Sequence, residues 1–121
     1  MKDTENRNPL KIKSYAFALR IVKLCQYLKK EKDEYILSRQ VLRSGTAIGA
    51  LISEAKFGQS KADFVSKMSI GLKEAIETDY WLCLLKDGGY IDENLYKSLA
   101  FDLNEIISML VSTVKTAKNG N

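Results

Sequence analysis

Five charged residues lie on helical faces that are otherwise apolar, and these residues are the first candidates for a chemical role: Arg39, Arg43, Glu54, Glu74 and Glu77. Glu74 with Glu54 or Glu77 could supply carboxylates to a metal site of the ferritin-like kind, but such sites also use Glu-x-x-His. The chain contains no histidine. The alternative pairs Arg43, and also Arg39, with these glutamates, because pairing avoids the cost of burying a lone charge. We therefore predict a structural polar network at the five residues and no metal site.

The residue types needed for catalysis are scarce. Histidine, the commonest general base and transition-metal ligand, is absent. The two cysteines, Cys25 and Cys83, lie in apolar helical patterns, and we expect both to be reduced core residues of a cytoplasmic protein. We predict no catalytic residue, no cofactor and no enzymatic activity.

A basic stripe on the first expected helix is the candidate nucleic-acid surface. Residues 1–32 hold nine Lys and Arg against three acidic residues, so the excess positive charge lies at this end of the chain. At about 100° per residue, five of these residues share one sector: Lys13, Arg20, Lys23, Tyr27 and Lys30. Lys and Arg neutralise phosphates, and an aromatic ring between them can stack on a base. The alternative is an ordinary solvated helix face.

The elements that must position these residues are four helices. Hydrophobic periodicity predicts them over about residues 11–31, 34–58, 61–87 and 92–117 of a single domain 1–121, after a flexible tail 1–10. Ser60 and Asp92 have the character of N-caps, and Gly88-Gly89 that of a stop. No apolar run approaches the roughly 20 residues that a membrane span requires, and the first residues lack the apolar stretch of a secretory signal. Short connections favour an all-α, antiparallel, up-and-down four-helix bundle.

Two helices carry more packing surface than one bundle needs. Apolar residues cover about 240° of the first helix, although a stripe of about 100° suffices to face a core. In the second helix Gly45, Ala47, Gly49 and Ala50 leave the middle thin, so we expect a neighbouring helix to approach closely there. We predict that another subunit covers the first helix on a second side.

Two stretches resemble a known family: residues 38–55, with the pattern RSGTxIGA from Arg43 to Ala50, and residues 60–82, with KEAxETxYWL from Lys73 to Leu82. They are similar to the four-helix bundle family of the 23S ribosomal RNA intervening-sequence proteins. Ala47 and Leu51 depart from its pattern, where Ser and Asn are usual, and each makes the second helix more apolar.

The resemblance implies a small bacterial cytoplasmic protein that assembles into a ring-like homopentamer with no enzymatic activity. It extends to the accessory variability determinant of diversity-generating retroelements, a basic pentameric protein that binds nucleic acid and a reverse transcriptase. We therefore expect a non-enzymatic oligomer that binds RNA or DNA through its basic surface. The alternative is an interaction scaffold that recruits a protein partner such as a reverse transcriptase.

Overall fold

Four helices make up most of the chain. The computed structural model describes residues 8–120, and within them the helices are α2 (Pro9–Lys32), α3 (Ile36–Ala55), α4 (Lys61–Asp87) and α5 (Glu93–Asn119). That part of the chain contains no strand. The all-α prediction is therefore confirmed.

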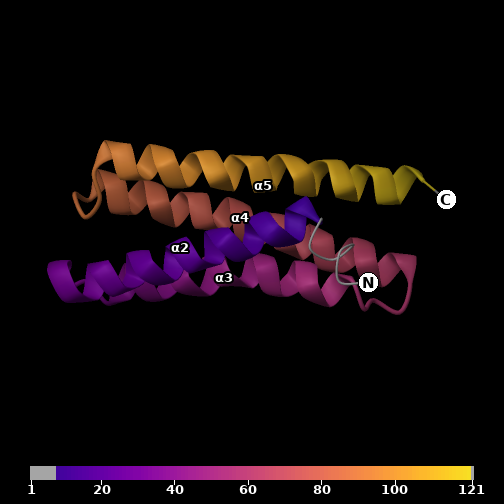
Figure 1. Cartoon of the computed structure of the whole chain (residues 1–121), viewed down its shortest axis with the longest axis horizontal. Helices are drawn as coiled ribbons and strands as arrows, with labels where there is room; N and C mark the ends of the chain where they lie inside the picture. Colours follow the sequence, from indigo (N-terminus) through magenta and orange to yellow (C-terminus); the bar gives the residue numbers. More distant parts are fainter. Residues whose placement is uncertain (1–7, 121) are drawn as a thin grey trace.

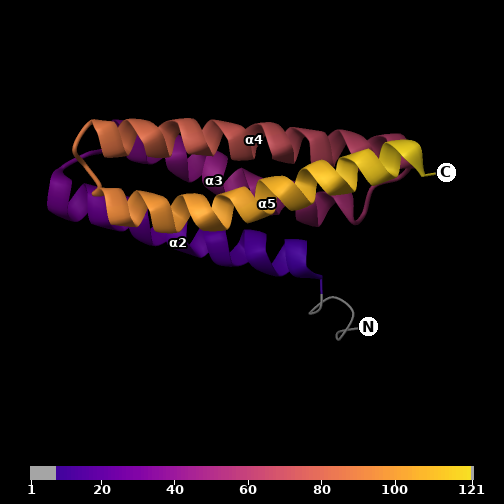
Figure 2. The same cartoon turned by 90° about the horizontal axis from the view of Figure 1, so that it is seen from above.

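The helices run alternately up and down around one core. Contacts join α2 with α3, α3 with α4, α4 with α5, and α5 back to α2, whereas the backbones of the diagonal pairs stay further apart within residues 8–120. Figures 1 and 2 show the resulting bundle, in which each helix lies antiparallel to the helices that precede and follow it. The first and last helices are therefore neighbours, although they are far apart in sequence.

The inward rows of the helices match the periodicity of the sequence. On α3 the buried positions step by four and three residues, as in left-handed bundle packing: Val41, Gly45, Ile48, Ile52 and Ala55. The rows on the other helices centre on Ile21 of α2, Leu82 of α4 and Leu103 of α5, all three fully buried. Each such side chain contributes about 1.5–3 kcal/mol to stability by leaving water.

Helix α2 begins earlier than the sequence predicted. The side chain of Asn8 accepts a hydrogen bond from the amide of Lys11, and Pro9 occupies the first helical position, where its missing N–H costs nothing. Residues 9 and 10 are thus helical rather than part of a tail, and Leu10 is buried. Residues 1–7 of the predicted tail lie outside the described residues.

Helix α3 is shorter than predicted because the residues at both of its ends make capping and turn hydrogen bonds instead of helical ones. Glu34 is buried before the helix, where its carboxylate accepts hydrogen bonds from the amides of Ile36, Leu37 and Ser38 at 2.8–3.1 Å. At the other end the amide of Gly58 bonds to the carbonyl of Ala55 in a turn. The predicted caps of the later helices are confirmed: the Ser60 hydroxyl accepts from the Asp63 amide and the Asp92 carboxylate from the Leu95 amide.

Helices α2 and α3 approach closely through small residues, as predicted. A Cβ atom on Gly45 would lie 2.9 Å from Cγ1 of Ile21, closer than packed carbons approach. Further along, a Cβ atom on Gly49 would lie 3.5 Å from the carbonyl oxygen of Ser14. The glycines therefore set the spacing between the two helices.

Candidate functional site

The structure divides the predicted basic stripe of α2 into two parts. In the first part, Nζ of Lys13 lies 3.2 Å from Oε1 of Glu105, and Nη1 of Arg20 lies 2.7 Å from Oδ2 of Asp102. The Arg20 guanidinium also donates to the side-chain hydroxyl and carbonyl of Ser98. These two cations tie α2 to α5, and carboxylates offset their charge.

The second part of the stripe lies exposed. Lys23, Tyr27 and Lys30 follow one another at spacings of four and three residues, which places them on one helix face. They make no hydrogen bond or ion pair with any residue in the described range 8–120. Lys29 and Lys32 add positive charge in the last turn of α2, where cations are stabilised by the negative end of the helix dipole. This end of α2 is the strongest uncompensated basic surface that the sequence prediction named.

A small pocket lies between the exposed cations and helix α5. Its volume is about 250 Å³, and it is lined by Arg20, Lys23, Leu24, Tyr27, Leu95 and Leu99. Leu24 and Leu99 are buried, whereas the Tyr27 side chain is 40% exposed. The pocket thus combines apolar walls with two cations and one accessible aromatic ring.

The outer face of α2 explains the wide apolar arc in the sequence. Four large apolar side chains on it remain exposed in the single chain: Ile12, Tyr15, Leu19 and Val22. Tyr15 is 67% exposed, and Ile12 and Leu19 are each about half exposed, at 48% and 47%. Contiguous exposed apolar surface of this kind marks interaction sites in soluble proteins.

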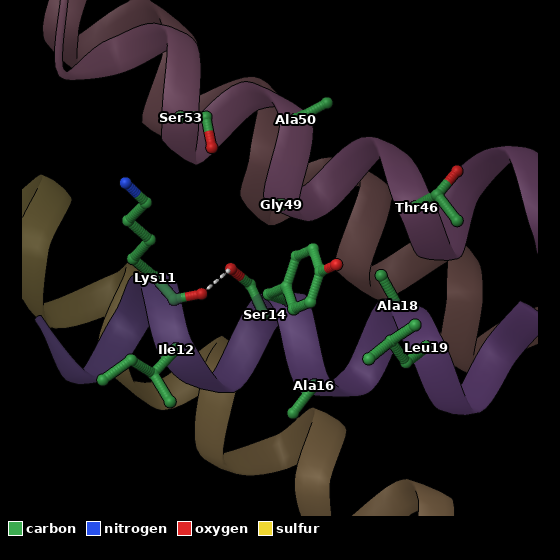
Figure 3. Close-up of a pocket in the computed structure, with 11 residues that line it drawn as sticks. Lys11, Ile12, Ser14, Ala16, Ala18, Leu19, Thr46, Gly49, Ala50 and Ser53 are labelled. Atoms are coloured by element: carbon green, nitrogen blue, oxygen red, sulfur yellow. Dashed lines mark hydrogen bonds between the residues drawn. The ribbon is translucent and has the colours of Figure 1, made fainter. Parts of the chain in front are cut away.

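This outer face continues into a groove between α2 and α3. The groove has a volume of about 600 Å³, with Ile12, Tyr15 and Leu19 on α2 and Gly49 and Ala50 on α3 among its lining residues. Figure 3 shows the hydroxyl of Ser14 hydrogen-bonded to the carbonyl of Lys11 on the same helix. Because that hydroxyl is satisfied, the groove offers mainly carbon to an occupant.

Three of the five predicted network residues come together between α3 and α4. Arg43 donates to the carboxylates of Glu74 at 3.3 Å and Glu77 at 2.5 Å, and the Trp81 indole N–H donates to Glu77 at 3.0 Å. The hydrogen bonds from Trp81 and Arg43 hold the pKa of Glu77 below its usual value. Arg39 and Glu54 are exposed and take no part. Residues 8–120 contain no group of three or more His, Cys, Asp or Glu side chains placed to hold a metal ion.

The cysteines differ from each other. Cys25 is buried and donates to the carbonyl of Ser38, and burial raises the pKa of its thiol to about 11. Cys83 is only half-buried, 3.3 Å from the hydroxyl of Tyr96, which also donates to Asp79. The core prediction is thus confirmed for Cys25 but wrong for Cys83, because α5 brings polar groups to that side of α4. The hydrogen bond with Cys83, followed by burial and the nearby Asp79 carboxylate, raises the pKa of Tyr96.

Comparison with known proteins identifies the family. The model of the 23S rRNA-intervening sequence proteins matches residues 9–112. The chain belongs to this family. A crystal structure of a protein of unknown function from the S23 ribosomal protein family of Bacteroides thetaiotaomicron VPI-5482 is also similar. The two share 50% identity with a TM-score of 0.89, over 96% of this chain and 100% of the other. Among curated proteins, none matches.

The two stretches that carry the intervening-sequence family resemblance contact each other. Arg43 and Ser44 belong to the first stretch, and they meet Glu74, Glu77 and Thr78 of the second. The hydroxyls of Ser44 and Thr78 are both buried and lie 2.9 Å apart. Leu51, where the family usually has Asn, packs beside Gly71 of α4. These contacts hold α3 against α4, and the first stretch also lines the groove between α2 and α3 with Thr46, Gly49, Ala50 and Ser53.

Within the described chain no helix is both long enough and apolar enough to span a membrane.

The sequence prediction did not name three polar residues that the structure shows in hydrogen bonds: Glu34, Tyr96 and Asp102. Glu34 had a local signal, since it directly precedes an apolar helical run. Asp102 had none, because its partner Arg20 is 82 residues away.

Proposed function

We propose that this member of the intervening-sequence family is a non-enzymatic, self-associating protein of the cytoplasm that binds RNA or DNA. The observation that supports binding is the exposed face of Lys23, Tyr27 and Lys30, which makes no ion pair within residues 8–120. Uncompensated cations bind phosphates by releasing counterions, and an exposed ring adds stacking. The free thiols of Cys25 and Cys83 suit a reducing compartment.

RNA is the first ligand to test. The family description names 23S rRNA, which supports RNA as the ligand class. The resemblance to the accessory variability determinant points in the same direction, because that protein is a nucleic-acid binder. Neither fact identifies a sequence preference, so binding is best measured first on structured ribosomal RNA fragments.

Self-association is the second part of the proposal. The exposed row of Ile12, Tyr15, Leu19 and Val22, together with the adjoining groove, offers an apolar surface larger than scattered surface residues provide. A second copy of the chain would bury this surface. The ring and its five subunits are proposed from the family resemblance, and a ring would repeat the weak basic surface of each α2 several times.

The test of nucleic-acid binding uses a charge-reversed double variant, Lys23→Glu with Lys30→Glu. Fluorescence anisotropy with a structured fragment of 23S rRNA should show at least tenfold weaker binding, and a salt dependence reduced by roughly two phosphate contacts. The matched control is Lys115→Glu with Lys118→Glu on α5, which changes the net charge equally and removes two exposed lysines elsewhere. Equal losses in both double variants would mean that net charge, not this face, binds RNA.

The test of self-association uses Leu19→Glu at the centre of the outer face. Native mass spectrometry should show smaller assemblies for this variant and unchanged assemblies for Phe101→Glu, because Phe101 is 66% exposed on α5, outside the groove. A wild-type protein that is a monomer at micromolar concentration would contradict this part of the proposal.

A protein-recruiting scaffold is the second candidate function, and the groove between α2 and α3 favours it. Its apolar lining suits a helix of another protein, such as a reverse transcriptase, as well as a second copy. If the protein binds no nucleic acid at low salt yet remains oligomeric, the scaffold function replaces the nucleic-acid function.

A further inference from the structure

We propose that the pocket between α2 and α5 receives a single unpaired base, so that the protein prefers single-stranded to double-stranded nucleic acid. The inference rests on the proposed nucleic-acid function and adds the form of ligand that the site accepts. The pocket has a volume of about 250 Å³ and is lined by Arg20, Lys23, Leu24, Tyr27, Leu95 and Leu99.

The lining determines the chemistry of the occupant. Its apolar lining is Leu95, which is partly buried, with Leu24 and Leu99 more deeply buried behind it, and such a lining suits a flat, weakly hydrated group. Lys23 and Arg20 at the same pocket favour an anion beside that group. A nucleotide joins both properties in one ligand, and the exposed ring of Tyr27 can stack on its base.

Arg20 and Lys23 have different parts in this pocket. The guanidinium of Arg20 is held by Oδ2 of Asp102 at 2.7 Å and by Oγ of Ser98 at 2.9 Å. It is therefore a fixed planar group, whose charge Asp102 largely offsets. Lys23 has no such partner within residues 8–120 and supplies the uncompensated charge for a phosphate.

The acidic residues of α5 disfavour a duplex at this site. Asp102 and Glu105 lie on the α5 side of the stripe, where a wide double helix lying across both helices would bring its phosphates near their carboxylates. A single strand can instead follow α2, on which Lys23 and Lys30 are separated by about 10 Å along the axis. An unpaired base can enter the pocket without the cost of breaking a base pair, whereas the base faces of a duplex are covered.

The test compares a single strand with its duplex and with a strand of equal length that lacks bases. Anisotropy is measured on the full chain with three labelled oligonucleotides: a single-stranded oligoadenylate, its duplex with oligouridylate, and an abasic strand of equal length. The wild-type protein should bind the oligoadenylate most tightly. Tyr27→Ser should weaken oligoadenylate binding about tenfold, the effect of losing one stacked base, and leave abasic binding unchanged. Tyr27→Phe, which keeps the ring, should bind as the wild type does.

A pair of lysine variants separates the pocket from the general charge of α2. Lys23→Gln removes a lysine that lines the pocket, whereas Lys29→Gln removes another exposed lysine of the same helix that does not line it. The oligoadenylate should lose more affinity with the first change than with the second. Equal binding of single strand and duplex, with no effect of Tyr27→Ser, would overturn the base pocket while leaving the proposed function intact. Failure to bind any of the three probes at low salt would overturn both.

Discussion

The guanidinium of Arg20 lies 2.7 Å from the carboxylate of Asp102, in an ion pair that crosses from the first helix to the last. Together with the ion pair of Lys13 and Glu105, it means that two of the four cations in the basic stripe join α2 to α5. Exposed ion pairs of this kind contribute little stability, typically less than about 1 kcal/mol. Their larger effect is on charge, because they leave only the C-terminal half of α2 strongly basic.

Removing the carboxylate of Asp102 should make this surface bind nucleic acid more tightly. In Asp102→Asn the charge of Arg20 is no longer offset, so we expect affinity for single-stranded RNA to rise about two- to fivefold at low salt, the effect of roughly 0.5–1 kcal/mol. Anisotropy measures it. The control is Asp87→Asn, which removes an equal charge from the end of α4, the helix diagonal to α2 in the bundle. Weaker binding by Asp102→Asn than by the wild type would contradict this prediction.

The two glycines facing α2 should respond oppositely to alanine. Each substitution gains up to about 1 kcal/mol of helix propensity. At Gly45 the new Cβ would lie 2.9 Å from the buried Ile21, whose branched side chain cannot shift easily, so we expect a net destabilisation of about 1–2 kcal/mol. At Gly49 the nearest atoms would be 3.5 Å away, so we expect a neutral or stabilising change. Urea unfolding of both variants measures the difference, and equal effects would argue against the close approach at Gly45.

Protonation of Glu77 should be visible through Trp81, the only tryptophan in the chain. Hydrogen bonds from Trp81 and Arg43 lower the pKa of Glu77 below its usual 4.5. The contact therefore stabilises the folded protein above that pH, and its contribution is lost as the pH falls through the lower, folded-state pKa. Tryptophan fluorescence should change in this acidic range while far-ultraviolet circular dichroism stays constant. Glu77→Gln should abolish the fluorescence transition, and a transition that persists in that variant would assign it to another group.

The two thiols should differ in reactivity. Burial raises the pKa of Cys25 to about 11, so at pH 8 its thiol is protonated as well as inaccessible. Iodoacetamide followed by mass spectrometry should modify Cys83 first and Cys25 only after unfolding. The thiol of Cys25 ionises at a lower pH in the unfolded chain than in the folded protein. We therefore expect its contribution to stability to decline as the pH rises from 9 towards 11. Equal rates of modification in the native protein would contradict the burial of Cys25.

Local signals in the sequence were sufficient for most of the fold. Periodicity located the inward rows, and Ser60 and Asp92 were recognisable as caps because capping depends on residues only three apart. Asn8 and Pro9 carried a start signal too, but it was outweighed by the polar residues before them. Glu34 was harder to foresee, since its three bonds depend on the way the chain turns between α2 and α3.

The candidate site was less predictable because it depends on which helices are neighbours. The angular position of Lys13, Arg20, Lys23, Tyr27 and Lys30 on α2 follows from spacing alone. The division of this stripe follows from the carboxylates of α5, whose placement no local pattern reveals. The same holds for the charged network, where the α3–α4 register selects Arg43 but not Arg39 or Glu54.

The contact between α2 and α5 has a consequence for the order of folding. Three of the four helix pairs are joined by short connections, so their contacts close small loops and can form early. The α2–α5 pair must close a loop of about 80 residues, at a higher entropic cost. We therefore expect the contact between α2 and α5 to form last, after the three pairs that are joined by short connections. The pocket between α2 and α5, which residues of both helices line, would then form only at this last step.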